Sequence, residues 1–163
     1  MEYISTRNNN KKYSFSEIFI KGLAEDGGLF VPLNIRKFDD NKINSLKKLS
    51  YIDLATEIIH LYTDDFLSKK DLNEIIKKSY SKFREKDVVK IVDLNEFKIL
   101  ELFHGPTLAF KDIAMQLIGN MYEHYLKSNN KIINIIVATS GDTGAAAIDA
   151  IKGKSNLNIF VLH

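Results

Sequence analysis

Apolar residues in the first half of the chain recur every three or four positions, the spacing that lines one face of a helix. Three such stretches follow Ser14, Ser50 and Ser68, and Ser14 stands three residues before Glu17, the spacing of a capping box. Their apolar positions are Phe15, Ile18, Phe19 and Leu23, then Leu54, Ala55, Ile58, Ile59 and Tyr62, then Leu72, Ile75, Ile76, Tyr80 and Phe83. We therefore predict three helices, with a glycine turn and a short strand over residues 29–31 between the first two.

In the second half of the chain the pattern changes to extended apolar runs. Residues 88–92 and 97–102 have the composition of strands joined by a polar turn. A helix is predicted from Thr107 to the polar segment 128–130, and a shorter one, rich in alanine, over residues 145–151. The nearly continuous apolar run over residues 132–138 is typical of a parallel strand buried on both faces. A last strand is predicted over residues 157–162.

The polar segment 84–87 separates these two patterns and is the predicted domain boundary. We expect a small, mostly helical domain over residues 1–87 and, over residues 88–163, the first part of a parallel-sheet domain, so the fold class is α/β. The chain stops at His163, where a parallel strand should pass into its crossover helix. We therefore expect the chain to be a truncated, N-terminal piece of a longer protein.

Composition narrows the classes of function. The chain has 163 residues, a net charge of +2 and no cysteine, which excludes disulfides and thiolate metal sites and fits a reducing compartment. No basic stripe indicates a nucleic-acid partner, and no apolar run is long enough to span a membrane. The four histidines lack metal-ligand spacing: His60 and His124 fit the helix surface or helix packing, and for His104 turn stabilisation is favoured over contact with a cofactor. We predict a cytoplasmic protein without a metal site.

The segment 101–112 joins a strand, a tight turn and a helix. Gly105-Pro106 ends the strand, Thr107 can cap the helix, and the charge of Asp112 suits the first helical turn. Lys111 is a cation at the positive end of that helix, directly after three apolar residues. Its stem can simply lie on the surface with the ammonium in water. Alternatively, the helix end and partial burial favour a neutral, nucleophilic amine, as a Schiff-base lysine requires. Spacing leaves both interpretations open.

A second candidate site is the loop Thr139-Ser140-Gly141-Asp142-Thr143-Gly144, which lies between a predicted strand and a predicted helix. Backbone N–H groups at a helix start and three hydroxyls can bind an anion, although the same residues also form ordinary turns. The loop has neither a Walker sequence nor dinucleotide-binding glycine spacing. A right-handed β-α-β unit would place this loop and Lys111 at the carboxyl ends of adjacent parallel strands.

Three separate segments resemble threonine synthases. The nine residues from His104 to Asp112 resemble the segment that carries the pyridoxal-phosphate lysine of that family. Residues 3–7, 14–15 and 22–32 resemble its N-terminal domain, with Asn8 standing where the family usually has glycine. Asparagine also tolerates a left-handed backbone, so the turn can persist. The loop over residues 139–144 resembles the loop that holds the anionic groups of the substrate in threonine synthases and related fold type II pyridoxal-phosphate enzymes.

The resemblance implies an activity and a set of site residues. Threonine synthases are lyases of threonine biosynthesis that convert O-phosphohomoserine and water to L-threonine and phosphate with pyridoxal 5'-phosphate. Lys111 would be the catalytic lysine and hold the cofactor as a Schiff base, with Phe110 packed nearby. The substrate anions would be bound by Thr139, Ser140, Gly141, Asp142, Thr143 and Gly144. The loop for the cofactor phosphate and the partner of the pyridine nitrogen belong, in this family, to a part beyond residue 163.

Two alternatives stay open at this point. One is a threonine-synthase-like phospho-lyase that acts on a related substrate such as O-phosphothreonine. The other is a truncated remnant or interaction stub without enzymatic activity. In either case the 163 residues alone are expected to bind pyridoxal phosphate poorly and to catalyse nothing.

Overall fold

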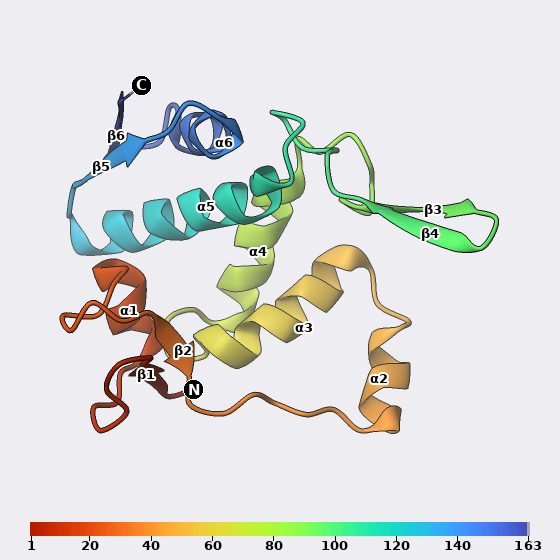
Figure 1. Cartoon of the computed structure of the whole chain (residues 1–163), viewed down its shortest axis with the longest axis horizontal. Coiled ribbons are helices and arrows are strands. Elements are labelled where there is room, and N and C mark those ends of the chain that lie inside the picture. Colours follow the sequence, from red (N-terminus) through yellow and green to blue (C-terminus); the bar gives the residue numbers. More distant parts are fainter. Residues whose placement is uncertain (163) are drawn as a thin grey trace. The chain divides into compact units, whose positions relative to one another are not determined.

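The computed structural model describes residues 1–162, which form two compact units, Met1–Glu74 and a second that begins at Ile75 (Figure 1). Helices and small sheets both occur, so the predicted α/β class is confirmed. The predicted domain boundary after residue 87 stays a prediction. Its second domain ends at His163, which lies outside the described residues.

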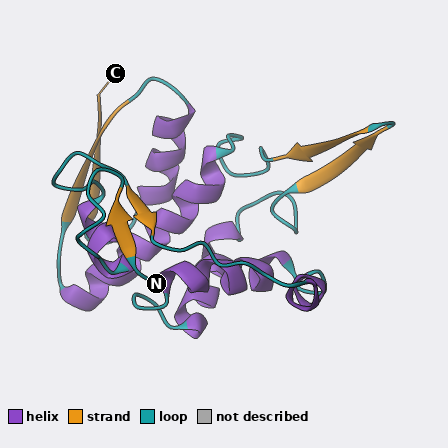
Figure 2. Cartoon of the chain, turned by 60° about the horizontal axis from the view of Figure 1, so that its bottom comes forward, coloured by secondary structure: helices purple, strands orange, loops and turns teal. Residues whose placement is uncertain are grey.

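The first unit is mostly helical, with strands confined to one short antiparallel pair (Figure 2). Its elements are β1 (Tyr3–Ser5), α1 (Phe15–Lys21), β2 (Phe30–Pro32), α2 (Asp40–Leu46), α3 (Tyr51–Thr63) and the first part of α4 (Lys69–Tyr80). The predicted capping box begins α1: Ser14 Oγ accepts from the N–H of Glu17, and the Glu17 carboxylate accepts from the N–H of Ser14. Buried Tyr3, Tyr13 and Ile18 form a small core beside it.

Helix α2 was absent from the prediction. Its sequence offers only Ile43 and Leu46 as large apolar residues, too few to produce a helical stripe. Local chemistry begins the helix instead, because Asp39 caps it by accepting from the N–H of Lys42 at 2.7 Å.

The second unit contains an antiparallel hairpin and one parallel pair. Its elements after α4 are β3 (Lys90–Leu94), β4 (Phe97–Glu101), α5 (Lys111–Asn129), β5 (Ile133–Ala138), α6 (Asp142–Ile151) and β6 (Leu157–Leu162). Strands β3 and β4 pair with each other, and β5 pairs in parallel with β6 through the crossover helix α6. Apolar side chains of α5, α6 and β6 pack together around Leu126, Ile151 and Leu157.

Three details of the prediction for this unit are wrong. The first strand begins at Lys90, because Val88 has a left-handed backbone (φ 64°) and is buried. Strand β5 is not buried on both faces: its residues alternate, and Ile136 is 71% exposed. Strand β4 pairs with β3 and not with β5, so the two do not form the β-α-β unit that was expected to align Lys111 with the loop.

The most buried face of α5 is polar. Asp112, Gln116, Asn120 and Glu123 follow one another at intervals of three or four residues and are each at most 7% exposed. Every buried side-chain nitrogen and oxygen among the described residues has a hydrogen-bond partner. Gln116 donates to Asp149 of α6 at 2.7 Å. This face therefore holds α5 against its neighbours by directed bonds.

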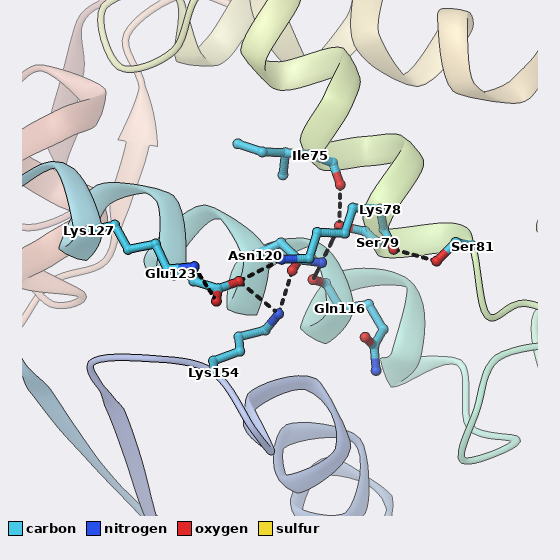
Figure 3. A network of polar contacts seen from close by, with 9 residues as sticks. All are labelled: Ile75, Lys78, Ser79, Ser81, Gln116, Asn120, Glu123, Lys127 and Lys154. Carbon is cyan, nitrogen blue, oxygen red and sulfur yellow. Dashed lines mark hydrogen bonds and ion pairs between the residues drawn. The ribbon is translucent and has the colours of Figure 1, made fainter.

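Glu123 belongs to the network of polar contacts that Figure 3 shows. Its carboxylate accepts from Lys78 of α4 at 2.7 Å and from Lys127 at 2.9 Å, and Lys154, beyond α6, lies 3.5 Å away. Asn120 joins the network by donating to Ser79 of α4 at 2.9 Å. Burial alone would raise the pKa of Glu123, but the lysine hydrogen bonds and charges outweigh it and lower the pKa to about 2.

Candidate functional site

Lys111 is the first residue of α5 and is partly buried. Its Nζ atom lies 3.8 Å from the centroid of the Phe110 ring, a cation–π contact. The Phe110 ring is 54% exposed. No carboxylate among residues 1–162 forms an ion pair with Lys111, although many lysines of the chain have such a partner. The amine of Lys111 is therefore presented at a helix start with an aromatic face beside it.

The turn before Lys111 differs from the predicted one. Thr107 does not cap α5; the capping position is Phe110, which makes no side-chain capping bond. Instead, the N–H of Thr107 donates to Oδ2 of Asp112 at 2.8 Å, and its hydroxyl donates to Oδ1 at 2.7 Å. Between them, Leu108 has a positive φ of 62°. The helix begins later than predicted because the Thr107 hydroxyl bonds to a side chain and not to a helix N–H group.

His104 fixes the other side of this turn. Its Nε2 atom lies 2.9 Å from Oε2 of Glu101, and its backbone oxygen accepts from the N–H of Arg84 at 2.9 Å. The ring is also tilted against Phe103, with centroids 4.8 Å apart. These contacts agree with the turn-stabilising interpretation of His104.

The loop over residues 139–144 connects β5 to α6. The N–H of Thr139 still pairs with Leu162 of β6, and the N–H of Gly144 returns to the oxygen of Gly141. Ser140, Gly141 and Asp142 are exposed, and no side chain caps the helix at Gly141. Within the described residues, the N–H groups of Asp142 and Thr143 have no acceptor. The loop therefore offers free donors at a helix N-terminus, which suits an anion.

Gly144 is confined by the first residue of the same loop. A Cβ atom at Gly144 would lie 2.6 Å from Cγ2 of Thr139, closer than packed carbon atoms approach. We expect Gly144→Ala to lower the free energy of unfolding by about 2 kcal/mol, since the β-branched Thr139 must move. Thermal unfolding of the variant measures this loss. Gly141→Ala is the matched control, because a Cβ there meets nothing within 4 Å, and an equal loss in both variants would contradict the expectation.

A cavity of about 260 Å³ is lined both by α5, the helix that begins with Lys111, and by the loop over residues 139–144. It is lined by residues of α5, β5 and α6, among them Met115, Val137 and Thr143. Met115 lies one helical turn after Lys111, and Thr143 belongs to the loop. Figure 1 shows β5 running back alongside α5, toward the end where α5 begins. Lys111 and the loop therefore lie at the same end of the α5–β5–α6 layer, through helix packing and not through adjacent strands.

Sequence reasoning missed two contributors to this site. Asp112 was assigned to the helix dipole alone, and Met115 was not singled out at all. The five-residue spacing of Thr107 and Asp112 was the available signal for their bond. Among residues 1–162, no three His, Cys, Asp or Glu side chains converge as metal ligands would, and no helix has the length and apolarity of a membrane span.

Comparison with known proteins finds relatives that align with nearly the whole chain. Residues 2–80 match the family described as threonine synthase N terminus. The threonine synthase of Saccharomyces cerevisiae is 44% identical over 177 residues, covering 99% of this chain and 34% of the yeast protein. Threonine synthase-like 2 of Xenopus laevis is 38% identical over 164 residues, covering 99% of this chain and 35% of the frog protein.

A solved structure agrees with these relatives. The crystal structure of pyridoxal-phosphate-bound threonine synthase from Brucella melitensis superposes with a TM-score of 0.93 at 39% identity, covering 99% of this chain and 35% of that one. The chain thus spans about a third of the length of the relatives it matches. With a matched N-terminal segment and this likeness over nearly all of its length, the chain resembles the N-terminal third of threonine synthases.

Proposed function

We propose that this chain supplies the cofactor lysine and the substrate-anion loop of a cytoplasmic threonine synthase. The reaction is the pyridoxal-phosphate-dependent conversion of O-phosphohomoserine and water to L-threonine and phosphate. One observation carries the proposal: Lys111, without a carboxylate partner among residues 1–162, begins α5, the free N–H groups of residues 142–143 begin α6, and the two helices line one cavity. In this proposal residues 1–87 are the N-terminal domain and residues 88–163 begin the catalytic domain.

The residues around Lys111 fit pyridoxal phosphate. An aldehyde cofactor needs an accessible amine that is not committed to an ion pair, and Lys111 meets this need within the described residues. The exposed ring of Phe110 offers an apolar face beside that amine. When bound, the cofactor supplies an electron sink that makes carbanions at the substrate carbons accessible. The relative from Brucella melitensis is described as bound to this cofactor.

The chain's own residues then have two tasks. Lys111 would hold the cofactor and would move protons at the substrate carbons. The loop over residues 139–144 orients the negative groups of the substrate through its N–H groups and hydroxyls. Ser140, Thr143 and the N–H of Asp142 are the donors that the exposed loop leaves available for this purpose.

A second candidate is a phospho-lyase that resembles threonine synthase. The 38% identity to threonine synthase-like 2 of Xenopus laevis favours it, because that relative is named apart from the synthases. Its residues at Lys111 and the loop would have the same tasks, and the difference would lie in the phosphorylated amino acid that the protein accepts.

The test is a substrate comparison on the protein at its natural length, established first by the intact mass of the native polypeptide. Phosphate release and threonine formation are measured with O-phosphohomoserine and with O-phosphothreonine. The proposal expects both products from O-phosphohomoserine, and the second candidate expects phosphate from O-phosphothreonine only. The isolated 163 residues are expected to release no phosphate. Absence of phosphate release from both substrates at natural length would overturn both candidates.

A further inference from the structure

We propose that Asp112 is a positioning residue for the reaction: it holds the turn that sets the direction of Lys111. The inference rests on the proposed function of Lys111. Asp112 follows Lys111 directly and is 0% exposed, whereas Lys111 is partly exposed. Neighbouring residues on a helix point in different directions, and no ion pair joins these two among the described residues. Asp112 therefore acts on Lys111 through the backbone and not as its counter-ion.

Both oxygens of Asp112 are committed to one residue. Oδ2 accepts from the N–H of Thr107 at 2.8 Å, and Oδ1 accepts from the Thr107 hydroxyl at 2.7 Å. The two bonds close a ring across residues 107–112, so the turn cannot open without breaking them. Gly105 packs on the same carboxylate, since a Cβ there would lie 2.5 Å from Oδ2 of Asp112. The site is built to receive this carboxylate and leaves no room beside it.

The turn has little else to hold it in shape. Leu108 takes the left-handed conformation that a residue with a Cβ disfavours, and its side chain is 51% exposed, so packing compensates little of the strain. The start of α5 has no side-chain cap. Two backbone bonds lie within it, from the N–H of Leu108 to the oxygen of Gly105 at 3.2 Å and from the N–H of Asp112 to the oxygen of Ala109 at 3.0 Å. Without Asp112, Leu108 would relax, and the first residue of α5 would change its direction with it.

Asparagine at residue 112 isolates this effect. It has the shape of aspartate, but its NH₂ group cannot accept a hydrogen bond. Where the amide oxygen accepts from the N–H of Thr107, the NH₂ group can only donate to the Thr107 hydroxyl oxygen, so two bonds to a charged carboxylate are replaced by weaker, neutral ones and the hydroxyl proton loses its acceptor. Thr107→Val removes only the hydroxyl bond and keeps the backbone bond, whereas Thr107→Ser keeps both. Asp71→Asn is the matched control, because Asp71 also lies in a first helical turn and accepts from a hydroxyl, that of Ser68, but is exposed.

The experiment uses the protein at its natural length and two readouts that do not depend on turnover. One is the rate at which pyridoxal phosphate becomes fixed to Lys111 under borohydride reduction, measured by peptide mass with Lys111→Ala as background. The other is amide exchange of residues 107–110. We expect Asp112→Asn to slow fixation about 10- to 100-fold, the usual cost of a misplaced reacting group, and to speed exchange. Thr107→Val should lie between, and Thr107→Ser and Asp71→Asn should match the unsubstituted protein.

Different results would overturn different claims. If Asp112→Asn and Thr107→Val both fix the cofactor at the rate of the unsubstituted protein, Asp112 has no positioning role. If Thr107→Ser is as slow as Thr107→Val, the hydroxyl bond is not the cause and the inference also fails. If the unsubstituted protein fixes no cofactor at Lys111, the proposed function fails and this role with it. Should Asp112→Asn not fold, the two Thr107 variants decide the question.

Discussion

Lys111→Ala is expected to abolish threonine formation from O-phosphohomoserine by the protein at its natural length. Alanine removes both the amine that would hold the cofactor and the base that would move protons at the substrate carbons. Loss of a covalent and general-base group of this kind costs on the order of 10³-fold or more in rate. The backbone at the start of α5 should be unaffected, because the interaction that the Lys111 amine makes is a cation–π contact with the exposed ring of Phe110.

The measurement is the rate of phosphate release together with cofactor absorbance and the far-ultraviolet circular dichroism of the variant. Lys86→Ala is the control, since Lys86 is exposed and lies outside the candidate site. A folded Lys111→Ala variant that keeps a tenth or so of the activity would rule out the catalytic role, because a general base alone contributes about 10²- to 10⁴-fold.

Glu123→Gln is expected to destabilise the second unit by about 2 kcal/mol at neutral pH. Glutamine keeps the volume but leaves Lys78, Lys127 and Lys154 without their common counter-charge. Lowering a carboxyl pKa from 4.5 to about 2 corresponds to roughly 3 kcal/mol of stability. Lys78 and Lys127 are more than half exposed, so water screens part of that contribution. Urea unfolding, monitored through amide exchange in α5, measures this loss of stability.

The same carboxylate predicts a dependence of stability on pH. Because folding lowers the pKa of Glu123, its contribution is fully present above pH 4.5 and is lost as the pH falls toward 2. The stability of α5 should therefore fall across this window in the native sequence and fall less steeply in Glu123→Gln. Glu96→Gln, at the exposed hairpin turn, should keep the native profile. Identical profiles for all three proteins would contradict the role assigned to the network.

The parts of the fold that were predicted correctly are set by contacts between residues close together in the sequence. Ser14, Ser50 and Ser68 precede three helices because a serine hydroxyl can accept from a backbone N–H two or three residues later, a bond visible in the spacing alone. The hairpin of β3 and β4 and the crossover of β5, α6 and β6 also join segments close in the chain. Helix α2 escaped notice because its apolar residues are too few.

The wrong predictions concern contacts between residues far apart in the chain, or a residue with two possible hydrogen-bond partners nearby. Which strand pairs with β5 depends on non-local contacts, so the expected neighbour β4 proved to belong to a separate hairpin. The polar residues of the buried face of α5 find Ser79, Asp149 and Lys154 from other elements, and the spacing within α5 does not reveal such partners. At the candidate site, Lys111 and the loop were found by resemblance, whereas the bond between Thr107 and Asp112 needed the folded turn.

The polar face of α5 has a consequence for how related sequences can diverge. An apolar contact tolerates many exchanges of similar size, but a buried donor needs an acceptor, so either partner alone is hard to replace. Gln116 with Asp149, and Asn120 with Ser79, should therefore change together among homologous proteins. We expect substitutions at the two residues of each pair to be correlated, whereas apolar positions such as Met121 should vary independently. This pattern would indicate that hydrogen bonds hold the helix in place.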